Sequence, residues 1–131
     1  MKLNLIKALL PLLFLSQLSL ADGVVNFYNW ADYIGESTIR DFEEEYGIKV
    51  NYDEYDSSEI VEAKLLAGNS GYDLVVHSSM YSKRLMPLKI FHEIDPTKLS
   101  NFEKLDPMLM EMLDEIDSGN KIMIPYSYGS T

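Results

Sequence analysis

Three strand-like segments alternate with two helical segments between residues 24 and 77, and this alternation constrains the fold more than any other feature. The strand-like segments are rich in β-branched and aromatic residues or alternate apolar with polar positions. Each helical segment is followed by a glycine, a common helix stop. The strands are expected at 24–30, 48–55 and 72–77, and the helices at 37–46 and 57–67. Two successive βαβ units with short connections predict an α/β fold with right-handed crossovers.

Local signals refine two of these elements. Asp56 followed by Glu59 resembles a capping box, so we expect Asp56 to accept hydrogen bonds from the first turn of the second helix. Residues 72–77 form a short apolar run, which is typical of a parallel strand buried in its sheet.

The pattern is weaker beyond residue 80. A short helix is expected at 80–86 and is stopped at Pro87, with a brief extended segment at 91–94. Pro107 stands at the first position of a further helix that runs to about residue 116. A turn and a final strand are expected after it, at 117–120 and 122–126.

Residues 1–21 have the composition of a secretory signal peptide. Lys2 and Lys7 accompany an apolar run, and Ser19 and Ala21 are the small residues of a signal-peptidase site, so we expect cleavage after Ala21. The alternative is a membrane anchor, but the run is shorter than the ~20 residues that span a bilayer. We therefore expect residues 22–131 to be exported, without stable membrane insertion after cleavage.

Charge and cysteine content narrow the partners and the compartment. The formal net charge is −10, which argues against nucleic acid as a partner, because such binding needs clustered lysine and arginine. An acidic surface would instead attract a cationic ligand. The chain contains no cysteine, so neither a disulfide nor a lipid-modified cysteine is available, and export without a tether indicates the bacterial periplasm.

No catalytic, metal or cofactor motif is present in the sequence. The two histidines, His77 and His92, belong to no HExxH-type metal motif, and nothing resembles a GxSxG nucleophile elbow. The glycines at 68 and 71 form neither a GxGxxG nor a Walker loop and fit a helix end and turn. We expect a protein that is not an enzyme, although an exported hydrolase on an α/β scaffold remains an alternative.

Aromatic and polar residues follow the first and third strands. Trp30, Asp32 and Tyr33 follow the first strand, and Ser78 and Tyr81 follow the third. Ligands of open α/β sheets bind outside the carboxyl ends of the parallel strands, so both segments should face one crevice. Rings, a carboxylate and hydroxyls together suit an alkylammonium ion. The alternative is that Trp30 and Tyr33 are core residues and that Asp32 caps the following turn.

Five motifs occur in order along the chain: FYNWADYI at 27–34, GIKV at 47–50, GYDLVV at 71–76, LDP at 105–107 and IPY at 124–126. In this order and spacing they resemble the periplasmic putrescine- and spermidine-binding proteins of ABC transporters. The likeness covers residues 24–131. The resemblance implies a type II periplasmic-binding-protein lobe with a βαβαβ core, a polyamine ligand, an inner-membrane ABC permease as partner, and a monomer.

The resemblance also assigns residues. Trp30 and Tyr33 match aromatics that flank the polyamine, Asp32 the acidic position beside them, Ser78 a serine that holds a terminal amine, and Tyr81 an aromatic at the pocket edge. Ala31 stands on the pocket wall, where the family has serine or threonine.

Two departures leave the function open within the class. Ala31 removes a hydroxyl, and His77 replaces a proline of the family. A receptor for another small cationic solute is therefore an alternative to a receptor for putrescine or spermidine. Family members have two lobes, and residues 22–131 match only the N-terminal one. We therefore expect an incomplete receptor that alone binds polyamine weakly or not at all, or a non-functional fragment.

Overall fold

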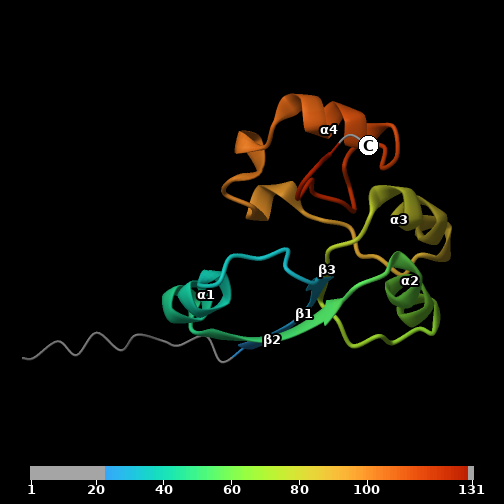
Figure 1. Ribbon diagram of the computed structural model, residues 1–131. Helices are drawn as coiled ribbons and strands as arrows, with labels where there is room; N and C mark the ends of the chain where they lie inside the picture. The colour runs from blue at the N-terminus through green and yellow to red at the C-terminus, as the bar shows by residue number, and fades with distance from the viewer. Residues whose placement is uncertain (1–22, 130–131) are drawn as a thin grey trace, which may run out of the picture.

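The computed structural model describes residues 23–129 (Figure 1). The predicted signal peptide and its cleavage after Ala21 lie outside the described residues. Within 23–129 no helix is both long enough and apolar enough to cross a membrane.

A three-stranded parallel sheet forms the centre of the fold, in the order β2-β1-β3. Strand β1 (Gly23–Trp30) pairs with β2 (Ile48–Tyr55) along its whole length, from Gly23 opposite Ile48 to Trp30 opposite Tyr55. Strand β3 (Leu74–Val75) pairs with β1 on the other side, beside Phe27 and Tyr28. The two strands predicted first are confirmed with their boundaries, and so is the predicted βαβαβ order.

Two helices connect the strands and lie on either side of the sheet (Figure 1). Helix α1 (Thr38–Tyr46) joins β1 to β2, and α2 (Ser58–Leu66) joins β2 to β3. These connections cross the sheet in opposite directions, so right-handed crossovers place the two helices on opposite faces. The carboxyl ends of all three strands consequently meet at one edge.

The capping box predicted at Asp56 is wrong by one residue. Ser57 is the N-cap of α2, and its Oγ accepts from the backbone N–H of Ile60 at 3.4 Å and donates to the Glu59 carboxylate at 3.0 Å. Strand β2 continues to Tyr55, so Asp56 is the bend that follows, and Ser57 is the residue with the extended backbone that an N-cap requires.

The buried strand predicted at 72–77 is also wrong in length and in burial. Only Leu74 and Val75 are in strand conformation, and Leu74 is 52% exposed. The reason is that β3 is an edge strand here: within residues 23–129 it pairs with β1 alone. Asp73 anchors its start, because the carboxylate accepts from the backbone and side-chain N–H groups of Asn26 at 2.9 and 3.1 Å.

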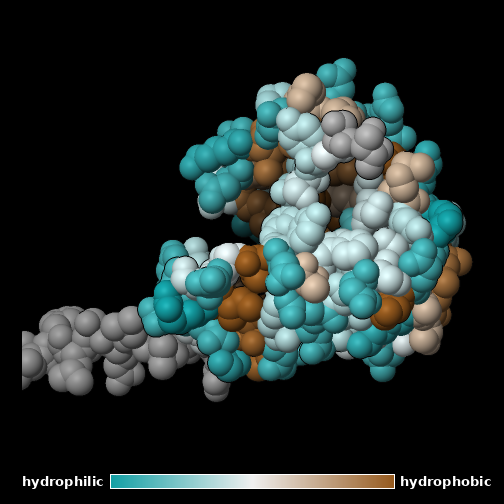
Figure 2. Space-filling view, viewed as in Figure 1, coloured by the Kyte–Doolittle hydropathy of each residue, from teal (hydrophilic) through white to brown (hydrophobic). Residues whose placement is uncertain are grey.

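The core lies between the sheet and the helices α2 and α3 (Ser79–Leu85). Its buried hydrophobic residues are Tyr28, Tyr55, Val61, Leu65 and Leu85. Helix α1 contributes no buried residue. Figure 2 shows hydrophobic side chains at several places on a face that is otherwise largely hydrophilic.

The segment after α3 consists of short helical pieces. Helix α3 confirms the helix predicted at 80–86, but Pro87 does not end the helical path, because it lies inside the 3₁₀ turn η1 (Met86–Leu88). Residues 91–94 form no strand. Two further 3₁₀ turns, η2 (Pro96–Lys98) and η3 (Phe102–Lys104), precede α4 (Pro107–Asp114). The prediction of α4 is confirmed: Asp106 caps it by accepting from Met108 N–H at 2.8 Å and Leu109 N–H at 3.3 Å.

The final strand predicted at 122–126 is not present, whereas the turn before it is confirmed. Asp117, only 1% exposed, determines the conformation of this segment through its hydrogen bonds. Its carboxylate accepts from the backbone N–H groups of Ile122 and Met123 at 2.7 and 2.8 Å, and its carbonyl accepts from Asn120 N–H at 2.7 Å. A side chain thereby occupies those two N–H groups, and the apolar segment 122–126 forms a loop instead of a strand.

Replacing Asp117 by alanine should destabilise this segment. Two backbone N–H groups would lose a charged acceptor, which costs about 2 kcal/mol in the free energy of unfolding. Urea denaturation measures the change. Asp95→Ala is the control, because the Asp95 carboxylate also accepts from a backbone N–H, that of Thr97, but is exposed, and we expect a loss below about 1 kcal/mol. Equal losses in the two variants would contradict a special role for Asp117.

Candidate functional site

The strand order places a topological switch point between β1 and β3. In the order β2-β1-β3, the chain passes from β1 to β2 on one side and then crosses to β3 on the other side. A crevice therefore forms outside the carboxyl ends of β1 and β3. The residues predicted as ligand-binding follow these two ends. The position of the candidate site is therefore a consequence of the sheet order.

A tight turn follows β1. Ala31 N–H extends the ladder by donating to the Tyr55 carbonyl at 2.9 Å, and Tyr33 N–H closes the turn on the Trp30 carbonyl at 3.3 Å. Asp32 has a φ of 62°, a left-handed conformation that aspartate tolerates better than most residues. Ala31, Asp32 and Tyr33 are all exposed as a result.

Trp30 is half-buried at the base of this turn. Its ring lies 4.5 Å from the ring of Tyr55 and 6.3 Å from that of Tyr33, measured between centroids. Trp30 packs against the core, whereas Tyr33 is 53% exposed. The alternative that both rings are core residues therefore holds in part for Trp30 and is wrong for Tyr33.

Buried Asn29 holds the turn in place, and sequence reasoning missed it. Its Oδ1 accepts from Trp30 N–H at 2.8 Å, and its Nδ2 donates to Tyr52 Oη at 3.2 Å and to the Tyr33 carbonyl at 3.5 Å. The Tyr33 carbonyl also accepts from the hydroxyl of Tyr126. The available signal was an asparagine inside an apolar strand, a residue type that strands disfavour.

Ser78 and Tyr81 follow β3 and are both partly buried. Ser78 is the N-cap of α3, and its carbonyl accepts from the N–H groups of Tyr81 and Ser82 at 3.0 Å, while its hydroxyl makes no cap hydrogen bond. The hydroxyl and the ring of Tyr81 already have partners. The hydroxyl donates to Glu59 at 3.3 Å, and the Arg84 guanidinium lies 4.6 Å from the ring centroid. Ser78 is thus better placed than Tyr81 to offer a polar group.

Tyr55 connects the two groups of predicted residues. Its ring packs against Trp30, and its hydroxyl donates to the carbonyl of Val76, two residues before Ser78. Burial raises the pKa of the Tyr55 hydroxyl far above its ordinary value, so this group remains a protonated donor at every physiological pH.

A shallow hollow of about 300 Å³ lies at the carboxyl ends of β1 and β2, next to α2, and adds residues that were not predicted. Its lining residues are Tyr28, Ala31, Glu54, Tyr55, Asp56 and Ile60. Glu54 and Asp56 add two exposed carboxylates to that of Asp32, which makes this edge attractive to cations. The signal was available, since β2 ends at the same edge as β1 and β3.

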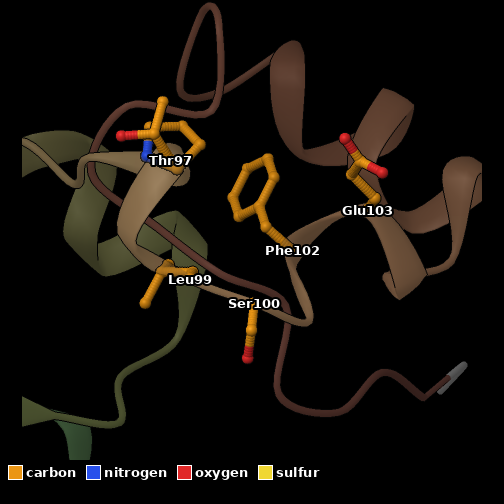
Figure 3. A pocket seen from close by; sticks show the side chains of 6 residues that line it. Thr97, Leu99, Ser100, Phe102 and Glu103 are labelled. Carbon is orange, nitrogen blue, oxygen red and sulfur yellow. The ribbon is translucent and has the colours of Figure 1, made fainter.

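A second hollow of about 400 Å³ lies elsewhere, between η2 and η3 (Figure 3). Phe102 and Leu99 line it together with polar residues, and it contains no predicted site residue. Within the part of the chain that the structure describes, no group of three or more histidine, aspartate or glutamate side chains could hold a metal ion.

Comparison with known proteins reveals relatives of one kind, although no family model matches the sequence. The chain is 46% identical over 107 residues to the putrescine-binding periplasmic protein SpuD of Pseudomonas aeruginosa, and 42% identical to the putrescine-binding periplasmic protein PotF of Escherichia coli. Each match covers 82% of this chain and 29% of the relative. The chain is a homologue of part of the polyamine-binding periplasmic proteins.

Solved structures agree with the sequence comparison. A spermidine/putrescine substrate-binding protein, PotD of Streptococcus pneumoniae, superposes with a TM-score of 0.73 at 32% identity, covering 80% of this chain and 32% of that one. The Tp0655 lipoprotein of Treponema pallidum gives a TM-score of 0.65 at 36% identity, over 69% of this chain and 28% of that one. The predicted resemblance to part of the polyamine-binding periplasmic proteins and the α/β periplasmic-binding-protein fold are thereby confirmed, and the chain spans about a third of these relatives.

Replacing Tyr55 by phenylalanine should loosen the link between the two halves of the candidate site. The variant loses the donor to the Val76 carbonyl but keeps the ring, so we expect about 1 kcal/mol less stability. Amide exchange at Val76, whose N–H donates to the Tyr28 carbonyl, should become faster. Tyr46→Phe on exposed α1 is the control. Unchanged exchange at Val76 in Tyr55→Phe would contradict the linking role.

Proposed function

We propose that this chain supplies one side of a polyamine-binding site in a periplasmic receptor that delivers its ligand to an ABC transporter. The observation that supports this most is the half-buried Trp30 ring at the switch point. The Ser78 hydroxyl makes no cap hydrogen bond to α3, and three carboxylates follow or end the strands at the same end of the sheet. The printed names of the relatives, which are periplasmic and bind putrescine or spermidine, support the same assignment.

The chemistry of these groups fits an aliphatic diamine. The faces of Trp30 and Tyr33 attract an ammonium group and cover the methylenes between two such groups. The carboxylates of Asp32, Glu54 and Asp56 complement the positive charge, and Ser78 Oγ can accept from an ammonium N–H. Ala31 offers a small apolar wall, and Tyr81 borders the site from α3.

The described residues predict weak binding. Asp32, Glu54 and Asp56 are exposed, so each contributes little attraction in water. One half-buried ring and one hydroxyl cannot replace the full hydration of two ammonium groups. We expect a dissociation constant of about 1 mM, which corresponds to roughly −4 kcal/mol.

The same proposal covers the organisation of the chain. Residues 1–21 act as a signal peptide, and residues 22–131 form a lobe of a monomeric receptor that works in the periplasm with an inner-membrane permease. The receptor performs no catalysis. The relatives' names and the sequence pattern support these assignments.

A receptor for a different small cation is the second candidate. Relatives of Pseudomonas aeruginosa with 36% and 31% identity are a putrescine/agmatine-binding and a putrescine/cadaverine-binding protein, so ligands vary among homologues of this chain. Ala31 lacks a hydroxyl with which to fix one amine, which favours a less selective site.

Titration of the protein with putrescine, followed by NMR chemical shifts, tests the proposal. We expect Trp30, Tyr33 and Ser78 to shift with one dissociation constant. The uncharged 1,4-butanediol, which has the same methylene chain, should cause no such shifts. Spermidine, agmatine and cadaverine distinguish the two candidates. Shifts confined to other residues, or equal shifts with the diol, would contradict the proposal.

Trp30→Leu should weaken putrescine binding about tenfold, because loss of a desolvated cation–π contact costs more than 1 kcal/mol. Leucine still fills space against Tyr55, and circular dichroism checks that the fold is retained. The control is Tyr46→Leu, which removes an exposed aromatic ring from α1. Equal affinities of the Trp30 variant and the control would argue against the assigned site.

A further inference from the structure

His77 occupies the junction between β3 and α3, directly before Ser78. Its ring lies against α3, with Nδ1 3.2 Å from the hydroxyl of buried Ser82 and the Tyr81 ring 5.6 Å away between centroids. The other nitrogen, Nε2, is buried and has no hydrogen-bond partner among the described residues. A buried polar atom in this state can remain only while it carries no proton that needs an acceptor.

The surroundings of His77 oppose a positive charge. Burial has the largest effect and lowers the pKa of the imidazole, and Arg84 on α3 acts in the same direction. Glu62 and the Ser58 backbone on α2 act in the opposite direction. Glu62, however, is already paired with Arg84 at 2.7 Å.

We propose that His77 is a proton-sensitive positioning residue, whose protonation rearranges the Ser78–Tyr81 segment and opposes the binding of a cationic ligand there. The ligand part of this inference rests on the proposed function. The rearrangement itself depends only on the junction.

Protonation turns both ring nitrogens into donors. Nε2–H then needs an acceptor, which it gains if water enters, if Glu62 moves away from Arg84, or if the ring shifts toward the Ser58 backbone on α2. Each of these changes displaces the backbone at Ser78, one residue along the chain. The new charge would also lie close to an ammonium group held by Ser78, so proton and ligand should compete, and the competition is reciprocal.

The pH window follows from the direction of the shift. The unfolded chain takes up the proton near pH 6.5, and the folded chain only at lower pH. Stability is therefore complete above about pH 6.5 and falls as the pH decreases from there toward the folded pKa. Ordinary carboxylates titrate near pH 4, below this window.

An NMR titration of both histidine rings between pH 8 and 4.5 tests the inference. We expect His77 to titrate below the ordinary histidine pKa of about 6.5, and the amides of residues 78–82 to shift with the His77 midpoint. Saturating putrescine should lower that midpoint further. Putrescine affinity should fall threefold or more between pH 7.5 and 5.5.

Two variants separate the sources of pH dependence. His77→Asn cannot titrate, so its putrescine affinity should vary little over this range, while His92→Asn should keep the dependence of the natural sequence. A His77 ring that titrates at or above the ordinary histidine pKa of about 6.5, or that remains neutral to pH 4.5, would overturn the inference. So would putrescine binding whose pH dependence is the same in His77→Asn. If putrescine does not bind but amides 78–82 follow His77, the proposed function fails and the junction switch stands.

Discussion

The arrangement of the three strand ends depends on one buried side chain, that of Tyr55, the last residue of β2. Its ring packs against Tyr28 and Trp30 of β1, and its hydroxyl donates to the carbonyl of Val76 after β3. One residue of β2 thereby joins the carboxyl ends of all three strands. Because β3 contributes only two residues to the sheet, this contact does much to fix the loop that carries Ser78.

The secondary-structure elements that were predicted correctly from the sequence are those that their own residues specify. Strand β1 is rich in β-branched and aromatic residues, β2 alternates such residues with polar ones, and α1 ends at a glycine in the left-handed conformation. Asp106 and Pro107 similarly specify the start of α4. The site edge was predictable too, because ligand position follows from strand order.

The elements that sequence reasoning missed are decided by tertiary contacts. Residues 122–126 have a strand-like pattern, yet the Asp117 carboxylate occupies two of their N–H groups. Leu74 looks buried in sequence but lies on an edge strand. Nothing in the local pattern distinguishes Trp30, which packs on Tyr55, from Tyr33, which is exposed.

The central claim is that a polyamine lies against Trp30 at the switch point between β1 and β3. Intermolecular nuclear Overhauser effects between the methylene protons of putrescine and the aromatic protons of the protein test it most directly. The account predicts effects to the Trp30 and Tyr33 rings. Effects to the Phe102 ring, in the hollow between η2 and η3, without any to Trp30 would contradict it.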